Sequence, residues 1–142
     1  MEGLNSMARY VALIDGKQGA YGVVAPDLPG CTSAGKTMDQ AYRNAIEAVR
    51  LWVEDAKASG ERLPRPRTLE ALRGDPDVAA ALAQGAAVAR VPLLRDSGRS
   101  ARANLSLDAG LLEAIDEAAD AHGLTRSAFI ATAAREKIEH GR

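Results

Sequence analysis

The stretch Arg102-Ala-Asn-Leu-Ser-Leu107 alternates polar and apolar residues, a pattern typical of a β-strand with one buried and one exposed face. Asp108 follows and is a suitable N-cap for a first helix. That helix is expected to end at His122-Gly123, because glycine favours the left-handed conformation that ends helices. Thr125 then caps a second helix. Residues 102–142 therefore predict the order strand, helix, helix.

These three elements are too small to bury a hydrophobic core alone. A second copy of the chain is the simplest cover, since two such strands can pair antiparallel around a two-fold axis with four helices behind them. A homodimer is therefore the smallest predicted assembly, and a homotetramer follows if the rest of the chain also pairs. The expected dimer core consists of Leu105, Leu107, Leu111, Ile115, Phe129 and Ile130.

The outer face of this two-stranded ribbon would present Arg102, Asn104 and Ser106. Such a ribbon fits the major groove of B-DNA, where Arg pairs with guanine, Asn with adenine and Ser with several base edges. The second helix offers free backbone N–H groups to a phosphate. The expected phosphate contacts are Arg99, Thr125, Arg126 and Ser127. In the alternative interpretation, Arg102 and Asn104 are ordinary solvent-facing strand residues.

Residues 8–94 predict a separate α+β domain with the order β-β-β-α-β. Strand formers occupy 8–15 and 20–25, and the turn 16–19 between them favours a hairpin. A short third strand follows at 31–35, and then a long helix that begins at Thr37 and ends at Gly60. Two short helical pieces at 68–72 and 77–84 lead to a last strand at 86–94. Pro92 predicts that the last strand lies at a sheet edge or that this proline lies near the end of the strand.

The long helix has one apolar face. Thr37 and Gln40 have the spacing of a capping box, in which two side chains satisfy free N–H groups at the helix start. The apolar positions are Met38, Tyr42, Ala45, Val49, Trp52 and Ala56. Trp52 is interpreted as core, with an interface anchor as the alternative. If this helix alone covers the sheet, the other face, with Val11, Leu13 and Val24, needs a protein partner.

The remaining segments connect these domains. Residues 95–101 are polar, contain Gly and Ser, and predict a hinge. Residues 1–7 are interpreted as a tag or a disordered start, with Met7 as the natural first residue. No apolar run reaches the roughly 18 residues of a membrane span, and no signal peptide is recognised. Together with a single cysteine, this predicts a cytoplasmic protein without a membrane partner.

The composition offers little support for catalysis. Asp15, Asp27 and Asp39 raise the alternative of a two-metal nuclease, but their positions fit turn and cap roles better. Cys31 has no histidine near it in the sequence and is interpreted as a structural thiol. The prediction is a non-enzyme that needs no metal and no cofactor. The net charge of −1 also means that any DNA contact depends on a local basic strip.

Two sets of motifs resemble one known family. Arg102-Ala-Asn-Leu-Ser-Leu107, Leu111-Leu-Glu-Ala-Ile-Asp116 and Gly123-Leu-Thr-Arg-Ser-Ala-Phe129 resemble a ribbon-helix-helix repressor. The other set resembles the N-terminal domain of HicB antitoxins. It consists of Asp27-Leu-Pro-Gly-Cys31, Gly35-Lys-Thr-Met-Asp-Gln-Ala41 and Asn44-Ala45. The two halves come in the order that this family uses.

The resemblance implies more than the residues do. It implies a partial ribonuclease-H-like domain that binds a HicA-type toxin, an mRNA-cleaving enzyme, and masks its active site. It also implies that the C-terminal domain binds operator DNA and represses the operon. This chain departs from the family at two positions: members often have an acidic residue where this chain has Lys36, and a proline where it has Asp108. The runner-up interpretation is a ligand-sensing ribbon-helix-helix repressor without a toxin, which predicts an apolar pocket with convergent polar groups.

Overall fold

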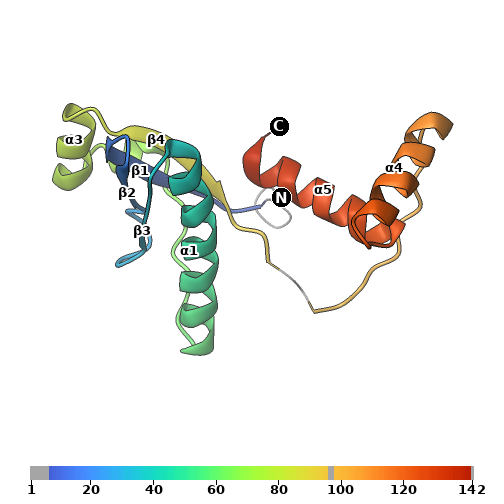
Figure 1. Ribbon diagram of the computed structural model, residues 1–142. Helices are drawn as coiled ribbons and strands as arrows, with labels where there is room; N and C mark the ends of the chain where they lie inside the picture. The colour runs from blue at the N-terminus through green and yellow to red at the C-terminus, as the bar shows by residue number, and fades with distance from the viewer. Residues whose placement is uncertain (1–6, 96–97, 142) are drawn as a thin grey trace. The chain divides into compact units, whose positions relative to one another are not determined.

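The computed structural model describes residues 7–95 and 98–141. The chain forms two compact units divided between residues 95 and 96, inside the segment predicted as a hinge (Figure 1). The first unit contains β1 (Arg9–Lys17), β2 (Ala20–Val24), β3 (Thr32–Gly35), α1 (Met38–Ala58), α2 (Leu69–Leu72), α3 (Pro76–Ala83) and β4 (Ala87–Pro92). The second contains α4 (Ala109–Ala121) and α5 (Arg126–His140). Residues 1–6 of the predicted tag and residues 96–97 of the predicted hinge lie outside the described residues.

The first unit is built on a four-stranded antiparallel sheet with the order β3-β2-β1-β4. This confirms the predicted α+β fold and the edge position of β4. The hairpin is tighter than expected, because Lys17 pairs with Ala20 and only Gln18 and Gly19 form the loop. Gly19 has a φ of +93°, which a glycine adopts without strain and which such a short loop requires. β1 therefore extends two residues beyond its predicted end.

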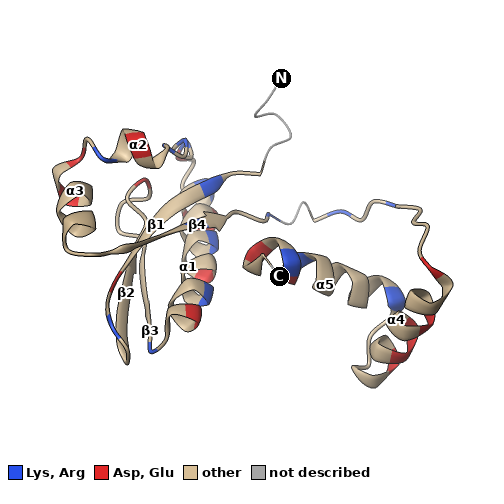
Figure 2. Ribbon diagram, turned by 90° about the horizontal axis from the view of Figure 1, so that it is seen from above, with Lys and Arg blue, Asp and Glu red and all other residues tan. Residues whose placement is uncertain are grey.

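Helices of the first unit pack on both faces of the sheet, with α1 on one side and α2 and α3 over part of the other (Figure 2). Tyr10 is buried on the α1 side, and Tyr21 packs partly buried on the same side. On the opposite side, Val11 and Leu13 pack against α2 and α3 and are 3% and 7% exposed. The expectation that these two residues need a protein partner is therefore wrong, because helices of the same chain cover them.

The helix α1 begins as predicted, with a modified cap. The Thr37 hydroxyl accepts the Gln40 N–H at 3.0 Å, but the Gln40 amide oxygen accepts the N–H of Lys36 instead of that of Thr37. The buried stripe is also rotated from the predicted face, and Met38 is 41% exposed. The buried positions of α1 are Ala41, Ala45, Ile46, Val49, Val53 and Ala56.

The segment after α1 carries the chain from one face of the sheet to the other and is fixed by polar contacts. The buried Asp27 carboxylate accepts the Arg67 backbone N–H at 2.7 Å and the Arg67 Nε–H at 2.6 Å. The Tyr10 hydroxyl donates to the Pro64 carbonyl at 2.7 Å. These contacts place α2 and α3 on the second face of the sheet.

The second unit consists of α4, α5 and the segment before them. Both predicted caps are present, because Asp108 accepts the N–H groups of Gly110 and Leu111 and Thr125 accepts that of Ala128. Gly123 has a φ of +69°, which confirms its predicted role at the end of the first of these helices. No helix in either described range is long and apolar enough to span a membrane.

Candidate functional site

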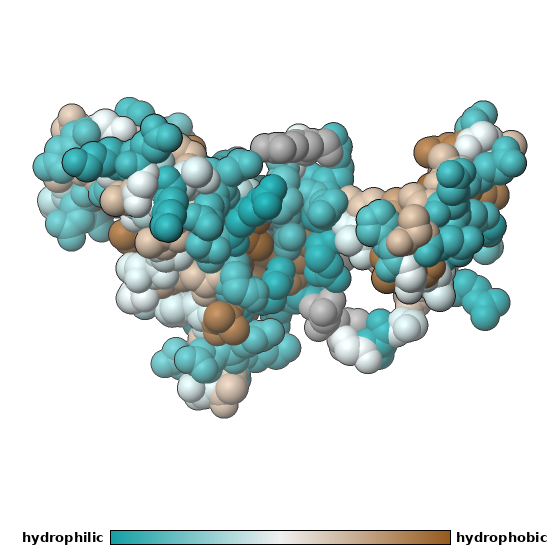
Figure 3. Space-filling model, in the orientation of Figure 1, coloured by the Kyte–Doolittle hydropathy of each residue, from teal (hydrophilic) through white to brown (hydrophobic). Residues whose placement is uncertain are grey.

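The second unit exposes the apolar side chains that were predicted to form a dimer core. Leu105, Leu107 and Leu111 are 61%, 40% and 50% exposed. The other three, Ile115, Phe129 and Ile130, are half-buried. Hydrophobic side chains are visible at the surface of this unit (Figure 3). Such a concentration of exposed leucines in a small unit is the signature of a surface that another molecule covers.

The predicted strand 102–107 has no strand structure within the single chain. A strand is held by hydrogen bonds to a neighbour, and no described segment of the chain pairs with these residues. The ribbon expected from the sequence therefore stays a prediction about two chains.

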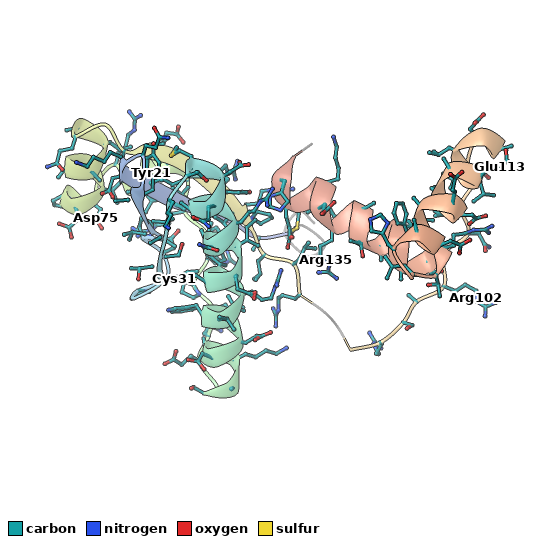
Figure 4. All side chains as sticks on the ribbon, viewed as in Figure 1. Tyr21, Cys31, Asp75, Arg102, Glu113 and Arg135 are labelled. Carbon is teal, nitrogen blue, oxygen red and sulfur yellow. The ribbon has the colours of Figure 1, made fainter. Side chains whose placement is uncertain are left out.

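Some of the predicted DNA-contacting residues lie close together. Asn104, Arg126 and Ser127 line one hollow of about 280 Å³, whose other walls include Leu105, Leu107 and Ile130. Polar and apolar residues of the segment face the same hollow because the segment lacks the alternation of a strand. Arg102 and Ser106 are exposed and do not line it, and the Arg102 side chain extends into solvent (Figure 4).

The start of α5 differs from the predicted phosphate clamp in one respect. Arg126 forms a two-pronged ion pair with Asp116 of α4, with Nε and Nη2 each 2.8 Å from a carboxylate oxygen. The hydrogen bond from Arg126 lowers the pKa of Asp116, and the same bond raises the pKa of Arg126. Asp116 therefore competes with any phosphate for this guanidinium. The competitor was not identified from the sequence, because only the folded helix pair brings residues 116 and 126 together.

The other predicted phosphate contacts have different surroundings. Thr125 accepts the Ala128 N–H at 3.1 Å, which leaves its hydroxyl proton free to be donated to an anion. Ser127 is exposed beside it, and Arg99 is an exposed residue of the predicted hinge. Acidic residues lie along α4 (Figure 2). The start of α5 and the segment before α4 are therefore better suited to a DNA contact than the acidic surface of α4, with Asp116 as the one α4 acid bonded to the start of α5.

The first unit contains the residues considered for catalysis. Both Asp27 carboxylate oxygens are engaged by Arg67, so this aspartate holds the fold together. Burial raises the pKa of the Cys31 thiol, which keeps it protonated and a poor nucleophile. The Trp52 side chain packs against the core, and its indole N–H donates to the Pro29 carbonyl at 2.8 Å. Within residues 7–95 and 98–141, no cluster of His, Cys, Asp and Glu has a geometry suited to a metal ion.

Residues 10–134 match the family described as HicB-like antitoxin of bacterial toxin-antitoxin systems. The chain belongs to this family. Among solved structures, the Burkholderia pseudomallei antitoxin HicB is similar with a TM-score of 0.52 and 31% identity, over 96% of this chain and 100% of that one. The structure of a HicA3 and HicB3 toxin-antitoxin complex is similar with a TM-score of 0.50 and 25% identity, over 61% of this chain and 99% of that one.

A phage protein is also similar to this chain in sequence. The uncharacterized 14.9 kDa protein of the rep-hol intergenic region of Haemophilus phage HP1 is 30% identical over 91% of this chain and 96% of its own length.

At the two positions where this HicB-like chain departs from its family, the structure shows ordinary local roles. Lys36 is exposed, and its carbonyl accepts the Gly19 N–H at 2.8 Å. Asp108 serves as a complete N-cap, so the departure from proline at this position leaves α4 intact.

Proposed function

We propose that this chain is an antitoxin with two activities. The first unit captures a HicA-type mRNA-cleaving toxin and masks its active site, and the second unit dimerises and represses the operon by binding operator DNA in the major groove. Membership of the HicB-like antitoxin family supports the antitoxin role. The observation that carries the DNA-binding half is the exposed row of leucines before and at the start of α4.

The leucines argue for a ribbon because of where they lie. Leu105 and Leu107 are two residues apart, so an extended chain would place both on one side. Pairing with the same segment of a second chain would bury both leucines of each copy against α4 and α5. It would leave Arg102, Asn104 and Ser106 on the opposite side, available to base edges.

Phosphate binding fits the same arrangement. The N-terminus of α5 carries the Thr125 and Ser127 hydroxyls and free backbone N–H groups. Arg126 contributes once it exchanges Asp116 for a phosphate, and Arg99 lies on the segment that leads into the ribbon. This exchange reduces the net gain from Arg126, because an existing ion pair must first be broken.

The toxin-binding half rests on relatives. The structure of a complex of HicA3 and HicB3 has been solved, and it is similar to 61% of the length of our chain. We extend that partnership to this chain and expect the partner to be a small protein encoded in an adjacent reading frame.

DNA binding is tested by titrating the purified full chain against its own upstream DNA and a scrambled control at two salt concentrations. A repressor binds the upstream DNA more tightly at both salts. Equal affinity for the two DNAs, with a steep salt dependence, would refute sequence reading and leave dimerisation as the role of the second unit.

Asn104→Ala tests the base contact. One bidentate contact contributes roughly 1–3 kcal/mol of base discrimination, so we expect about a 10-fold or greater loss of operator preference. The oligomeric state should not change, since Asn104 lies outside the proposed dimer core. Ser100→Ala, an exposed hinge substitution, is the matched control and should leave both properties unaltered. Unchanged selectivity in Asn104→Ala would remove this residue from the interface.

Toxin capture is tested by co-expressing the full chain with the adjacent small protein. We expect a co-purifying complex and the disappearance of mRNA cleavage in a purified assay. A toxin that remains active and separate at micromolar concentrations of the chain would refute the antitoxin role.

A further inference from the structure

The face of the sheet opposite α1 is only partly covered by α2 and α3. Leu13 of β1 pairs with Val24 of β2 on one side and with Val88 of β4 on the other, so these three residues form one row across this face. Leu13 is buried, but Val24 is 48% and Val88 is 41% exposed. The row therefore leaves an apolar side chain in solvent on each side of the covered strand.

The two ends of this row differ in their surroundings. Val24, but not Val88, lines a hollow of about 310 Å³ between the sheet, the loop after β2 and α3. We call this space the α3 hollow. Its apolar lining consists of Leu13, Val24, Ala25, Pro26, Leu28, Pro29, Val78 and Ala81. Figure 4 shows Asp75 at this end of the first unit, beside α3.

Three carboxylates line the α3 hollow, and no Lys or Arg does. Asp15 comes from β1, where it is exposed beside Gly22, and Asp77 comes from the first turn of α3. Asp75 is the N-cap of α3 and uses one carboxylate oxygen to accept the Asp77 N–H at 2.8 Å. No group of acids in the described ranges has the geometry of a metal site. The hollow therefore suits a cationic side chain with an apolar stem better than a bare cation.

We propose that the α3 hollow is the docking site for a basic surface of the toxin, and that an Arg or Lys of that protein inserts its side chain into it. This inference rests on the proposed function and adds the place and the chemistry of the contact. Arg and Lys bury their methylene stems against apolar walls while their charged ends remain at carboxylates, which matches the composition of this hollow.

Charge complementarity selects this partner. An enzyme that cleaves mRNA binds a polyanion and carries cationic side chains for that purpose. A site that offers three carboxylates above an apolar floor attracts such a surface and competes with RNA for it. The exposed Val24 adds an apolar contact at the rim of the hollow.

The test compares two pairs of full-length variants. It measures the affinity of each variant for the proposed toxin, the small protein encoded in the adjacent reading frame. Val24→Lys and the double variant Asp15→Lys/Asp77→Lys place positive charge in the hollow. Val88→Lys is the control for the first, since Val88 has similar exposure in the same row outside the hollow. Glu54→Lys/Glu61→Lys, at exposed acids elsewhere, controls for the change in net charge of the second.

We expect each hollow variant to weaken toxin binding about 30-fold or more, the effect of losing an interface hot spot, and each control to bind within about 3-fold of the unsubstituted chain. Thermal melting and operator DNA binding should remain unchanged in all four variants, which separates a lost contact from misfolding. Hollow variants that melt normally and capture the toxin as tightly as the controls would overturn the inference and leave the proposed function standing. No capture by the unsubstituted chain would instead refute the proposed function.

Discussion

Leu105→Ala tests the proposed dimer directly. Leu105 is 61% exposed in the single chain, and the substitution removes three carbon groups worth about 0.8 kcal/mol each when buried. Scaling the resulting ~2.4 kcal/mol by the exposed fraction gives about 1.5 kcal/mol per copy that dimerisation alone would supply. A two-fold dimer contains two copies, so the loss is about 3 kcal/mol, or roughly a 100-fold weaker dimer.

The assay is sedimentation equilibrium or light scattering over a dilution series that covers the dimer dissociation constant. Leu51→Ala is the matched control, because Leu51 is 57% exposed on α1 in the first unit. It removes the same atoms at nearly the same exposure and should leave the dissociation constant unchanged. If first units also pair, Leu105→Ala should convert tetramers into dimers. A Leu105→Ala protein that associates like the Leu51→Ala protein would refute the ribbon.

Four further predictions concern other contacts. Asp116→Asn should tighten DNA binding, because Arg126 then reaches a phosphate without first breaking its ion pair with Asp116. An unchanged affinity would mean that Arg126 does not reach DNA. The pKa of Asp116 is lowered in the folded state, so its ion pair with Arg126 stabilises the protein at any pH above the ordinary carboxyl pKa. This stabilisation is lost as the pH falls through the lowered pKa. The melting temperatures of the unsubstituted chain and of Asp116→Asn should therefore differ at neutral pH and converge in strong acid. Asp27→Ala should destabilise the first unit by about 2–3 kcal/mol, since it removes a buried charged acceptor of two hydrogen bonds, while the exposed Asp55→Ala should have little effect in the same denaturant titration. Gly35→Ala should cost about 1–3 kcal/mol, because its Cβ would collide with the backbone of Ala41, whereas Gly74→Ala meets only ordinary contacts; equal stability of the two variants would show that β3 is not pressed against α1.

The sequence predicted most elements because each carries a local signal. The caps at Thr37, Asp108 and Thr125 depend on side chains that bond within three residues of their own position, so they are visible in the sequence and present in the structure. Strand order was harder to predict, but Pro92 correctly indicated an edge, since proline cannot donate to a neighbouring strand.

The errors have a common origin in contacts between distant residues. Met38 fits the apolar periodicity of α1, yet the sheet buries Ala41, Ile46 and Val53 instead, because the close approach of β3 at Gly35 sets the rotation of the helix. Val11 and Leu13 were expected to need a partner, because the weak patterns of α2 and α3 gave no sign of where these helices pack.

The sequence by itself determined the two-part organisation, the helix boundaries and the apolar residues of the second unit, because these depend on composition, periodicity and capping over short distances. Only the tertiary structure decided that Asp27 binds Arg67, that Asp116 pairs with Arg126, and that Asp15 and Asp77 line one hollow with apolar walls. Each of these arrangements joins residues of different elements, and the folding of the backbone between them sets how close their charges come.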